Sequence, residues 1–246
     1  MLNLTAVIIG NEVMKFKNFD NFADIKYGVS EKSDGAMELA AGGLTSIHKR
    51  SAYFKGQGID VQKTVSPKQL HSAKVVKVSD KDRNKIIPGV DGLATSRKNL
   101  FLTITVADCF PIYFFDAASN TVGLSHSGWR GTVKNIAAKT VKVMSENPAN
   151  IIVGIGPGIQ ACHFEIKEDI LENFLKYPEA IINRDGKIFI DLPKIIRQEL
   201  IEAGLKNQNI ESSGECTFCE KEKYFSFRRD KPKNVEAMAA YVGLLF

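Results

Sequence analysis

Short runs of β-branched and aromatic residues, bounded by Gly, Pro, Asp or Asn, are the feature that most constrains how this chain can fold. Such runs are typical of β-strands. They occur at residues 5–9, 75–78, 100–106, 112–115, 121–125, 151–155 and 187–190. Helical segments do not alternate with them regularly, which disfavours a doubly wound parallel sheet. We therefore expect an α+β (mixed α/β) fold, in which helices cover mixed β-sheets.

Helical patterns are fewer than strand patterns. In residues 132–146, apolar side chains recur near helical spacing. Residues 193–203 follow Asp191, a good N-cap, and stop before Gly204. The sequence predicts helices at residues 132–146, 193–203 and 234–245, with a weaker candidate at 167–176.

The composition is that of a globular protein. The chain has 246 residues, of which 44% are hydrophobic and 25% charged, enough to bury a substantial core. Because no repeat or Pro/Gly/Ser-rich linker interrupts it, residues 1–246 are expected to form a single domain. The net charge of +5 is mild, and its lysines are interspersed with acids. This disfavours nucleic acid as a partner and is compatible with an anionic small substrate.

The sequence also bears on location. Residues 1–10 are apolar but lack a basic segment and a cleavage signal, which indicates a first strand rather than a signal peptide. No run approaches 18 apolar residues, so a membrane partner is not expected. Four cysteines in a chain of this length do not form a disulfide framework. We expect a cytoplasmic protein, in which a cysteine near histidines is more often a metal ligand or a nucleophile.

Three residues far apart in the sequence could bind one metal ion: His71, Cys109 and His126. Cys109 follows the predicted strand 100–106, and His126 follows the predicted strand 121–125. Catalytic and binding residues often lie at such strand ends and in the loops after them. Two imidazoles and one thiolate fill three corners of a zinc tetrahedron and leave the fourth open, as in catalytic zinc sites.

Other interpretations of these residues remain open. The same ligands would suit copper. Cys109 with His126 as its base could instead form a nucleophilic pair in an amide hydrolase. A non-catalytic zinc module would need a fourth protein ligand, for which His48 or His163 is available.

The other three cysteines are not expected to bind metal. Cys162 and His163 are adjacent, and neighbouring residues on a strand point to opposite faces. Cys216 and Cys219 form one CxxC pair, whereas metal ribbons need a second ligand pair. We therefore expect these residues to have structural roles.

Several segments, in order along the chain, resemble the purine nucleoside phosphorylase / polyphenol oxidase family (laccase-domain, YfiH/YlmD-like). They are DGLAT at residues 91–95, ADCFPI at 107–112, HSGWRG at 126–131, GPGI at 156–159, CHFEI at 162–166, CTFC at 216–219 and FSFRRD at 225–230. Because the matches span nearly the whole chain and several are five or more residues long, the resemblance is specific.

The resemblance implies a single-domain sandwich of mixed sheets with helices on its outer faces, in α/β/β/α layers. It also implies a zinc site formed by His71, Cys109 and His126. The implied activities are phosphorolysis of adenosine, inosine and methylthioadenosine, with deamination of adenosine. An older naming implies copper-dependent oxidation of phenols, and bacterial members are described as peptidoglycan editing factors, which would suit a muropeptide amidase.

Charged residues within the motifs are candidates for the substrate site. Arg130, Arg228 and Arg229 are expected to bind phosphate, because a guanidinium can hold it through two parallel hydrogen bonds. The expected partners are a purine nucleoside and phosphate, bound by a monomer or a homodimer.

Two aspartates complete the candidate site. Asp91 and Asp108 are expected to orient a ligand imidazole. We group Asp108 with Cys109, His126 and Arg130 as catalytic candidates, and Asp91 with the substrate-binding ones.

The chain departs from the family pattern in two places. Family members usually have an Arg or Lys two residues before a Gly-Gly-Val-Ser stretch, whereas here that position is Ile25 and only a shifted register places Lys26 there. The usual Gly-Arg after the segment ending at Asp230 is also missing. Both changes concern the expected substrate pocket and leave the three metal-ligand candidates intact.

Overall fold

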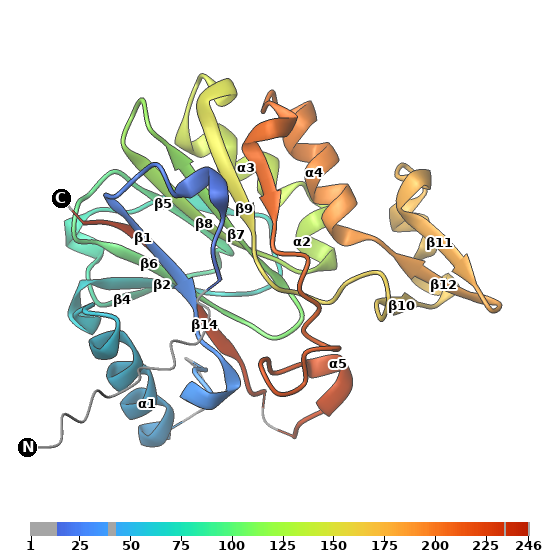
Figure 1. Ribbon diagram of the computed structural model, residues 1–246, viewed down its shortest axis with the longest axis horizontal. Coiled ribbons are helices and arrows are strands. Elements are labelled where there is room, and N and C mark those ends of the chain that lie inside the picture. Colours follow the sequence, from blue (N-terminus) through green and yellow to red (C-terminus); the bar gives the residue numbers. More distant parts are fainter. Residues whose placement is uncertain (1–13, 39–42, 234, 246) are drawn as a thin grey trace, which may run out of the picture.

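The computed structural model describes residues 14–38, 43–233 and 235–245, and in it two β-sheets pack face to face between helices (Figure 1). The five-stranded sheet has the order β1 (Ile25–Val29), β14 (Met238–Leu244), β6 (Phe101–Val106), β2 (Thr64–Lys68) and β4 (Lys85–Pro88). The six-stranded sheet has the order β13 (Ile210–Ser212), β9 (Ile151–Ile155), β7 (Phe110–Asp116), β8 (Thr121–Ser127), β5 (Gly92–Thr95) and β3 (Val75–Lys77). Both sheets combine parallel and antiparallel pairs.

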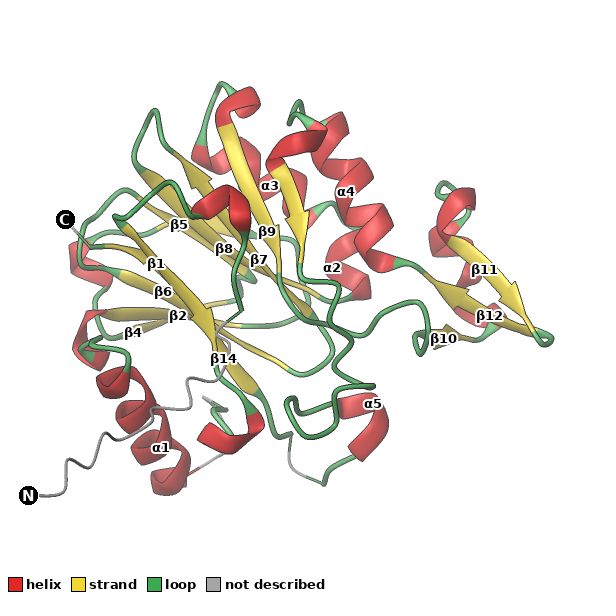
Figure 2. Cartoon of the chain, in the orientation of Figure 1, coloured by secondary structure: helices red, strands yellow, loops and turns green. Residues whose placement is uncertain are grey.

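Helices cover the outer face of each sheet (Figure 2). The helix α1 (Gly43–Gly56) packs on the five-stranded sheet, where Phe54 and Tyr241 share an apolar cluster. The six-stranded sheet carries α2 (Trp129–Val133), α3 (Ile136–Met144) and α4 (Leu192–Glu202). A small sheet of β10 (Glu165–Ile166), β12 (Lys187–Ile190) and β11 (Ile181–Arg184) projects at one end, and a short α5 (Phe227–Asp230) precedes the last strand. The α/β/β/α fold class is confirmed.

Most strand predictions are confirmed, because the central strands are covered on both sides and therefore appear as continuous apolar runs. Every residue of β7 and β8 is buried. The predicted strands at 75–78, 100–106, 112–115, 121–125, 151–155 and 187–190 all coincide with observed strands. The strand predicted at 5–9 lies outside the described residues.

The helix predictions have mixed outcomes. The helix at 193–203 is confirmed by α4. The helix at 132–146 is confirmed as helical, but the left-handed backbone of Asn135 divides it into α2 and α3. Residues Glu168–Phe174 form a 3-10 helix instead of an α-helix. The predicted final helix at 234–245 is wrong, because β14 occupies it. This strand pairs with β1 and β6, and all seven of its residues are buried. Tertiary pairing therefore overrides the helical propensity of its alanines.

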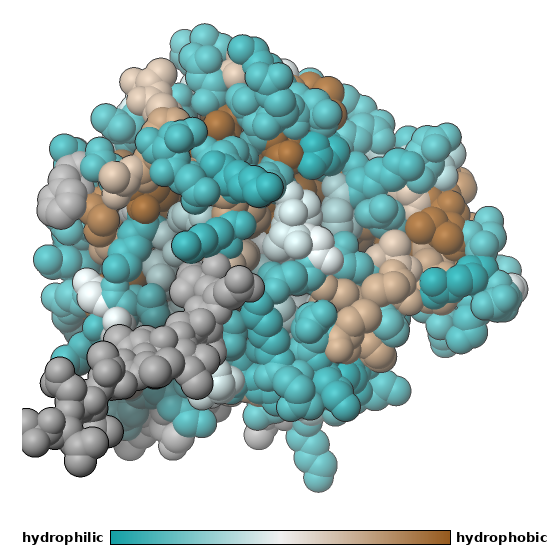
Figure 3. All heavy atoms as spheres, viewed as in Figure 1, coloured by the Kyte–Doolittle hydropathy of each residue, from teal (hydrophilic) through white to brown (hydrophobic). Residues whose placement is uncertain are grey.

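The surface shown in Figure 3 is largely hydrophilic, with apolar residues in small scattered groups. Among the residues that the structure describes, no helix is long and apolar enough to span a bilayer.

Candidate active site

The structure brings His71, Cys109 and His126 together at one end of the sandwich. His71 follows β2 of one sheet, His126 lies on β8 of the other, and Cys109 lies in the crossing between β6 and β7. Their potential ligand atoms all lie within 4.8 Å of one another, and Cys109 Sγ is 3.9 Å from His71 Nε2. His126 is buried, Cys109 is half-buried and His71 is exposed, so the group opens to the surface on the His71 side.

Asp91 holds two members of this group, His71 and His126, through hydrogen bonds. Its buried carboxylate accepts hydrogen bonds from the backbone N–H groups of Leu70 (3.1 Å), His71 (3.0 Å) and Ser72 (2.7 Å), and from the Ser72 hydroxyl (2.7 Å). It also lies 3.0 Å from His126 Nδ1. The bond to His71 supports that residue's left-handed backbone, at φ 55°. The bond to His126 fixes the imidazole so that Nε2 is left to bind a ligand.

Charges within the group reinforce one another. Burial opposes the ionised form of each residue, but hydrogen bonds from His126, Ser72 and Leu70 hold the pKa of Asp91 well below its usual range. Despite the same burial, the neighbouring Cys109 and Asp91 raise the pKa of His126 to about 9. In turn His126 and His71 outweigh burial and lower the pKa of Cys109 to about 6. The geometry therefore favours a thiolate, the form of cysteine that binds metals and attacks electrophiles.

Gly128 packs directly against the metal-ligand candidates. Its backbone conformation, φ −79° and ψ 171°, is open to any residue, so the requirement for glycine is spatial. A Cβ at this position would lie 2.6 Å from Cys109 Sγ and 3.2 Å from His71 Cδ2.

Gly128→Ala is expected to displace the Cys109 thiol and to weaken metal binding by about tenfold or more, because small shifts of ligands are costly at metal sites. Competition with a chromogenic chelator measures the affinity. Gly56→Ala is the matched control, since among the described residues nothing beyond its chain neighbours and its own helix backbone lies within 4 Å of a Cβ there. Unchanged affinity in Gly128→Ala would contradict the placement of Cys109.

Within the part of the chain that the structure describes, Asp108 does not make the expected contact with a ligand imidazole, and its catalytic role stays a prediction. Its backbone is left-handed, at φ 78°, and its carboxylate accepts hydrogen bonds from the Thr217 hydroxyl (2.7 Å) and the Arg228 backbone N–H (2.6 Å). Its carbonyl accepts a bond from the Ile159 N–H. Among the described residues it makes no hydrogen bond to either imidazole. It anchors the C-terminal segments beside Cys109, and Asp91 orients the histidine.

The three arginines also differ. Arg229 is committed to its own loop: its guanidinium donates to the carbonyls of Thr217, Phe218 and Tyr224 and to the Asp230 carboxylate. These bonds engage the guanidinium of Arg229 within its own loop, and the phosphate contact expected of it stays a prediction.

Arg130 and Arg228 remain as cationic candidates. Arg130 is exposed on α2 and lies over the Trp129 ring, at 4.4 Å from its centroid. Arg228 uses Nη1 to bond the Glu165 carbonyl, and its backbone is held by Asp108.

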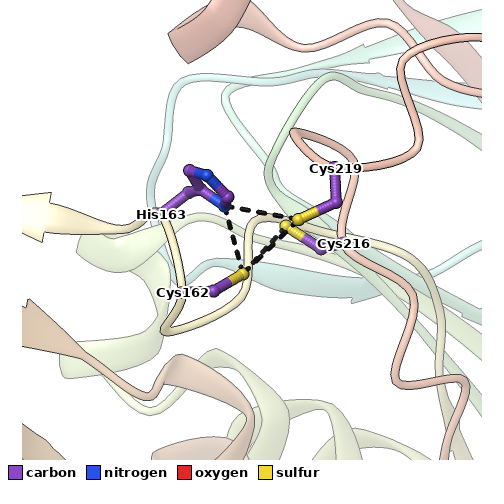
Figure 4. A group of neighbouring side chains, drawn as sticks. All are labelled: Cys162, His163, Cys216 and Cys219. Carbon is purple, nitrogen blue, oxygen red and sulfur yellow. Dashed lines mark hydrogen bonds between the residues drawn. The ribbon is translucent and has the colours of Figure 1, made fainter.

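The other three cysteines, for which structural roles were expected, form a second cluster with His163. Cys162, His163, Cys216 and Cys219 place their potential ligand atoms within 4.8 Å of one another (Figure 4). The opposite-face argument fails for the first two because they lie in a turn, and together they are the second pair that the CxxC lacked. His163 is therefore not a fourth ligand of the first group, and His48 is exposed on α1.

Comparisons with known proteins agree with this geometry. Residues 45–244 match the family described as "Multi-copper polyphenol oxidoreductase laccase". Purine nucleoside phosphorylase YlmD of Bacillus subtilis is 33% identical over 201 residues, covering 75% of this chain and 72% of the relative. Adenosine deaminase RL5, from an unknown prokaryotic organism, is 34% identical over 188 residues, covering 70% and 72%.

The fold of this chain also matches a solved structure. The crystal structure of the Bacillus licheniformis hypothetical protein YfiH has a TM-score of 0.87 at 30% identity, covering 94% of this chain and 96% of that one. The resemblance noted in the sequence is thereby confirmed, and the chain belongs to the multi-copper polyphenol oxidoreductase laccase family, together with the YfiH and YlmD proteins.

Proposed function

We propose that this chain is a cytoplasmic, zinc-dependent purine nucleoside phosphorylase. It converts adenosine, inosine or methylthioadenosine and phosphate into the free base and the sugar 1-phosphate, and deaminates adenosine at the same site. The observation that carries the proposal is the open three-ligand group of His71, Cys109 and His126, with His126 fixed by Asp91. Relatives named purine nucleoside phosphorylase and adenosine deaminase support the reaction class.

The donor set fits a catalytic zinc ion. Two imidazoles and a thiolate-forming cysteine supply three ligands, and no fourth His, Cys, Asp or Glu joins them among the described residues. When bound there, Zn²⁺ would supply an electrophilic position for a water molecule or a substrate oxygen. Copper shares these ligand preferences, so metal analysis must accompany any assay.

The chain's own residues supply orientation and charge. Asp91 holds the imidazole of His126 and the backbone of His71, so two of the ligands are positioned before any ion binds. Arg130 and Arg228 bring positive charge for phosphate. In phosphorolysis a phosphate oxygen bonds to C1′ of the sugar as the bond from C1′ to the base breaks, and the departing base takes up a proton.

Apolar surface is available for the purine. Leu70 is 61% exposed beside His71, and Phe227 is 53% exposed beside Arg228. Because Arg228 is tied to Asp108, next to Cys109, Phe227 is anchored toward the same end of the molecule. We propose that these two side chains contact the base.

The proposal is tested by measuring metal content and base release together. The wild type is expected to form adenine from adenosine only when phosphate is present, and Cys109→Ala is expected to lose that turnover together with one equivalent of metal. His48→Ala, which alters an exposed histidine outside both clusters, is the control. Turnover that survives in Cys109→Ala would refute the proposed role of this site. Amide cleavage of a muropeptide by metal-free protein would point instead to Cys109 as a nucleophile.

A further inference from the structure

All four cysteines and three of the four histidines of the chain fall into two groups, and the proposed function uses only one of them. The other group comes from two loops. Cys162 and His163 lie in a turn between β9 and β10, and Cys216 and Cys219 lie in a turn after β13 (Figure 4). These turns are more than 50 residues apart in the sequence, so their meeting is a product of the fold.

The distances within this group match the edges of a coordination tetrahedron. Cys162 Sγ lies 3.5 Å from Cys216 Sγ and 3.7 Å from Cys219 Sγ. His163 Nδ1 lies 3.2 Å from Cys162 Sγ and 3.3 Å from Cys219 Sγ. With zinc–ligand bonds of about 2.0 to 2.3 Å, a tetrahedral site has edges of about 3.8 Å between sulfurs and about 3.5 Å between sulfur and nitrogen. All four cysteines of the chain are free thiols in the structure.

The imidazole of His163 is oriented toward the three sulfurs. The His163 ring stacks on Phe218, with centroids 4.0 Å apart and planes at 16°, which holds Nδ1 toward the sulfurs.

We propose that Cys162, His163, Cys216 and Cys219 bind a second Zn²⁺ in a closed Cys₃His site. Four protein ligands leave no open position, so this ion is structural, in contrast to the three-ligand group at His71. Binding releases the protons of the three thiols. It reinforces two loops that backbone bonds already join, from the Gly158 N–H to the Glu215 carbonyl and from the Thr217 N–H to the Gly158 carbonyl.

The second site supports the first through Thr217, which lies between the paired cysteines. Its hydroxyl donates to Asp108, next to Cys109, and its carbonyl accepts a bond from Arg229. Asp108 in turn holds the backbone of Arg228. An ion at Cys216 and Cys219 therefore fixes the loop that presents Arg228 and anchors the Cys109 turn. The proposal rests on its own ligand set and does not depend on the identity of the substrate.

Metal analysis of purified variants by mass spectrometry tests the proposal. The wild type is expected to hold about two zinc ions per chain, and Cys219→Ala and Cys109→Ala about one each. His48→Ala is the control and is expected to match the wild type. Cys219 is chosen because it is exposed, which limits damage to the core. A wild type with one ion that Cys219→Ala retains would overturn the second site.

Cobalt substitution identifies which site a remaining ion occupies, and it requires no turnover. In Cys109→Ala protein loaded with Co²⁺, three thiolates are expected to give an intense near-ultraviolet charge-transfer band and tetrahedral visible bands, and Cys219→Ala in that background is expected to weaken both. If either variant does not fold, stepwise release of zinc from the wild type to a chromogenic chelator replaces the comparison, with two phases expected. A single phase, or a disulfide at Cys162 found by non-reducing peptide mapping, would refute the site.

Discussion

Replacing Asp91 with Asn is expected to weaken metal binding at His71, Cys109 and His126 by about 10- to 100-fold and to lower the free energy of unfolding by about 3 kcal/mol. The carboxylate is fully buried and takes part in five hydrogen bonds, three of them from backbone N–H groups. An amide has only one acceptor oxygen, so its NH₂ group would face at least one N–H donor. Chelator competition measures the affinity, and urea unfolding monitored by circular dichroism measures the stability.

Asp116→Asn is the matched control for this variant. Asp116 is also a buried aspartate, at the far end of β7, but its carboxylate caps only the local turn through Ala118 and Ser119. It is expected to cost about 1 kcal/mol and to leave the metal affinity unchanged. If Asp91→Asn bound metal as tightly as Asp116→Asn, Asp91 would not be the residue that positions the ligand histidines.

The sequence could predict the three candidate ligands because each lies in a short motif, and the motifs of Cys109 and His126 follow predicted strands. Their convergence follows from the sandwich. Because β6 and β7 belong to different sheets, the connection at Cys109 passes the end of β8 that carries His126. Of the two roles expected of Asp91, the structure supports one. Its orienting role agrees with the observed bonds, whereas the substrate contact expected of it finds no support, because its oxygens are engaged by the protein.

Other features could not be predicted because they depend on partners far away in the sequence. The segment Met238–Leu244 contains helix-forming residues, and only its position between β1 and β6 makes it a strand. Likewise, Cys162 and His163 converge with the CxxC pair because their backbone turns, which local residue types did not indicate. Arg228 and Arg229 are adjacent, and their residue type does not distinguish them. Only the hydrogen bonds of the folded protein show that Arg229 is engaged within its loop, whereas the guanidinium of Arg228 makes one bond, to the Glu165 carbonyl, among the described residues.

Glu199→Gln is expected to stabilise the protein by about 3 kcal/mol at pH 8 and to have little effect at pH 5. Glu199 is buried on α4, and this burial raises its pKa to about 7, although a hydrogen bond from the Tyr177 hydroxyl (2.6 Å) and the nearby Lys176 oppose the shift. Its Oε2 atom is buried without a hydrogen-bond partner among the described residues. A neutral amide keeps the bond from Tyr177 and avoids the cost of ionising a buried group.

The sign of this effect follows from proton linkage. Below about pH 4 Glu199 is protonated in both the folded and the unfolded protein, so its ionisation does not yet reduce the free energy of unfolding. Between about pH 4 and the folded pKa of about 7, the unfolded chain loses the proton first, so stability falls as pH rises. The difference in unfolding free energy between the wild type and Glu199→Gln should therefore grow across that interval and then level off. Denaturant unfolding at a series of pH values measures it.

The exposed Glu202, one turn along α4, is the control, since Glu202→Gln should change stability by less than about 0.5 kcal/mol at every pH. A Glu199→Gln difference that was the same at pH 5 and pH 8 would mean that Glu199 titrates normally in the folded protein. If the wild type were more stable than Glu199→Gln at pH 8, the Glu199 carboxylate would be ionised and stabilised in the folded protein. The hydrogen bond from Tyr177 and the charge of Lys176 would not be enough to explain that result.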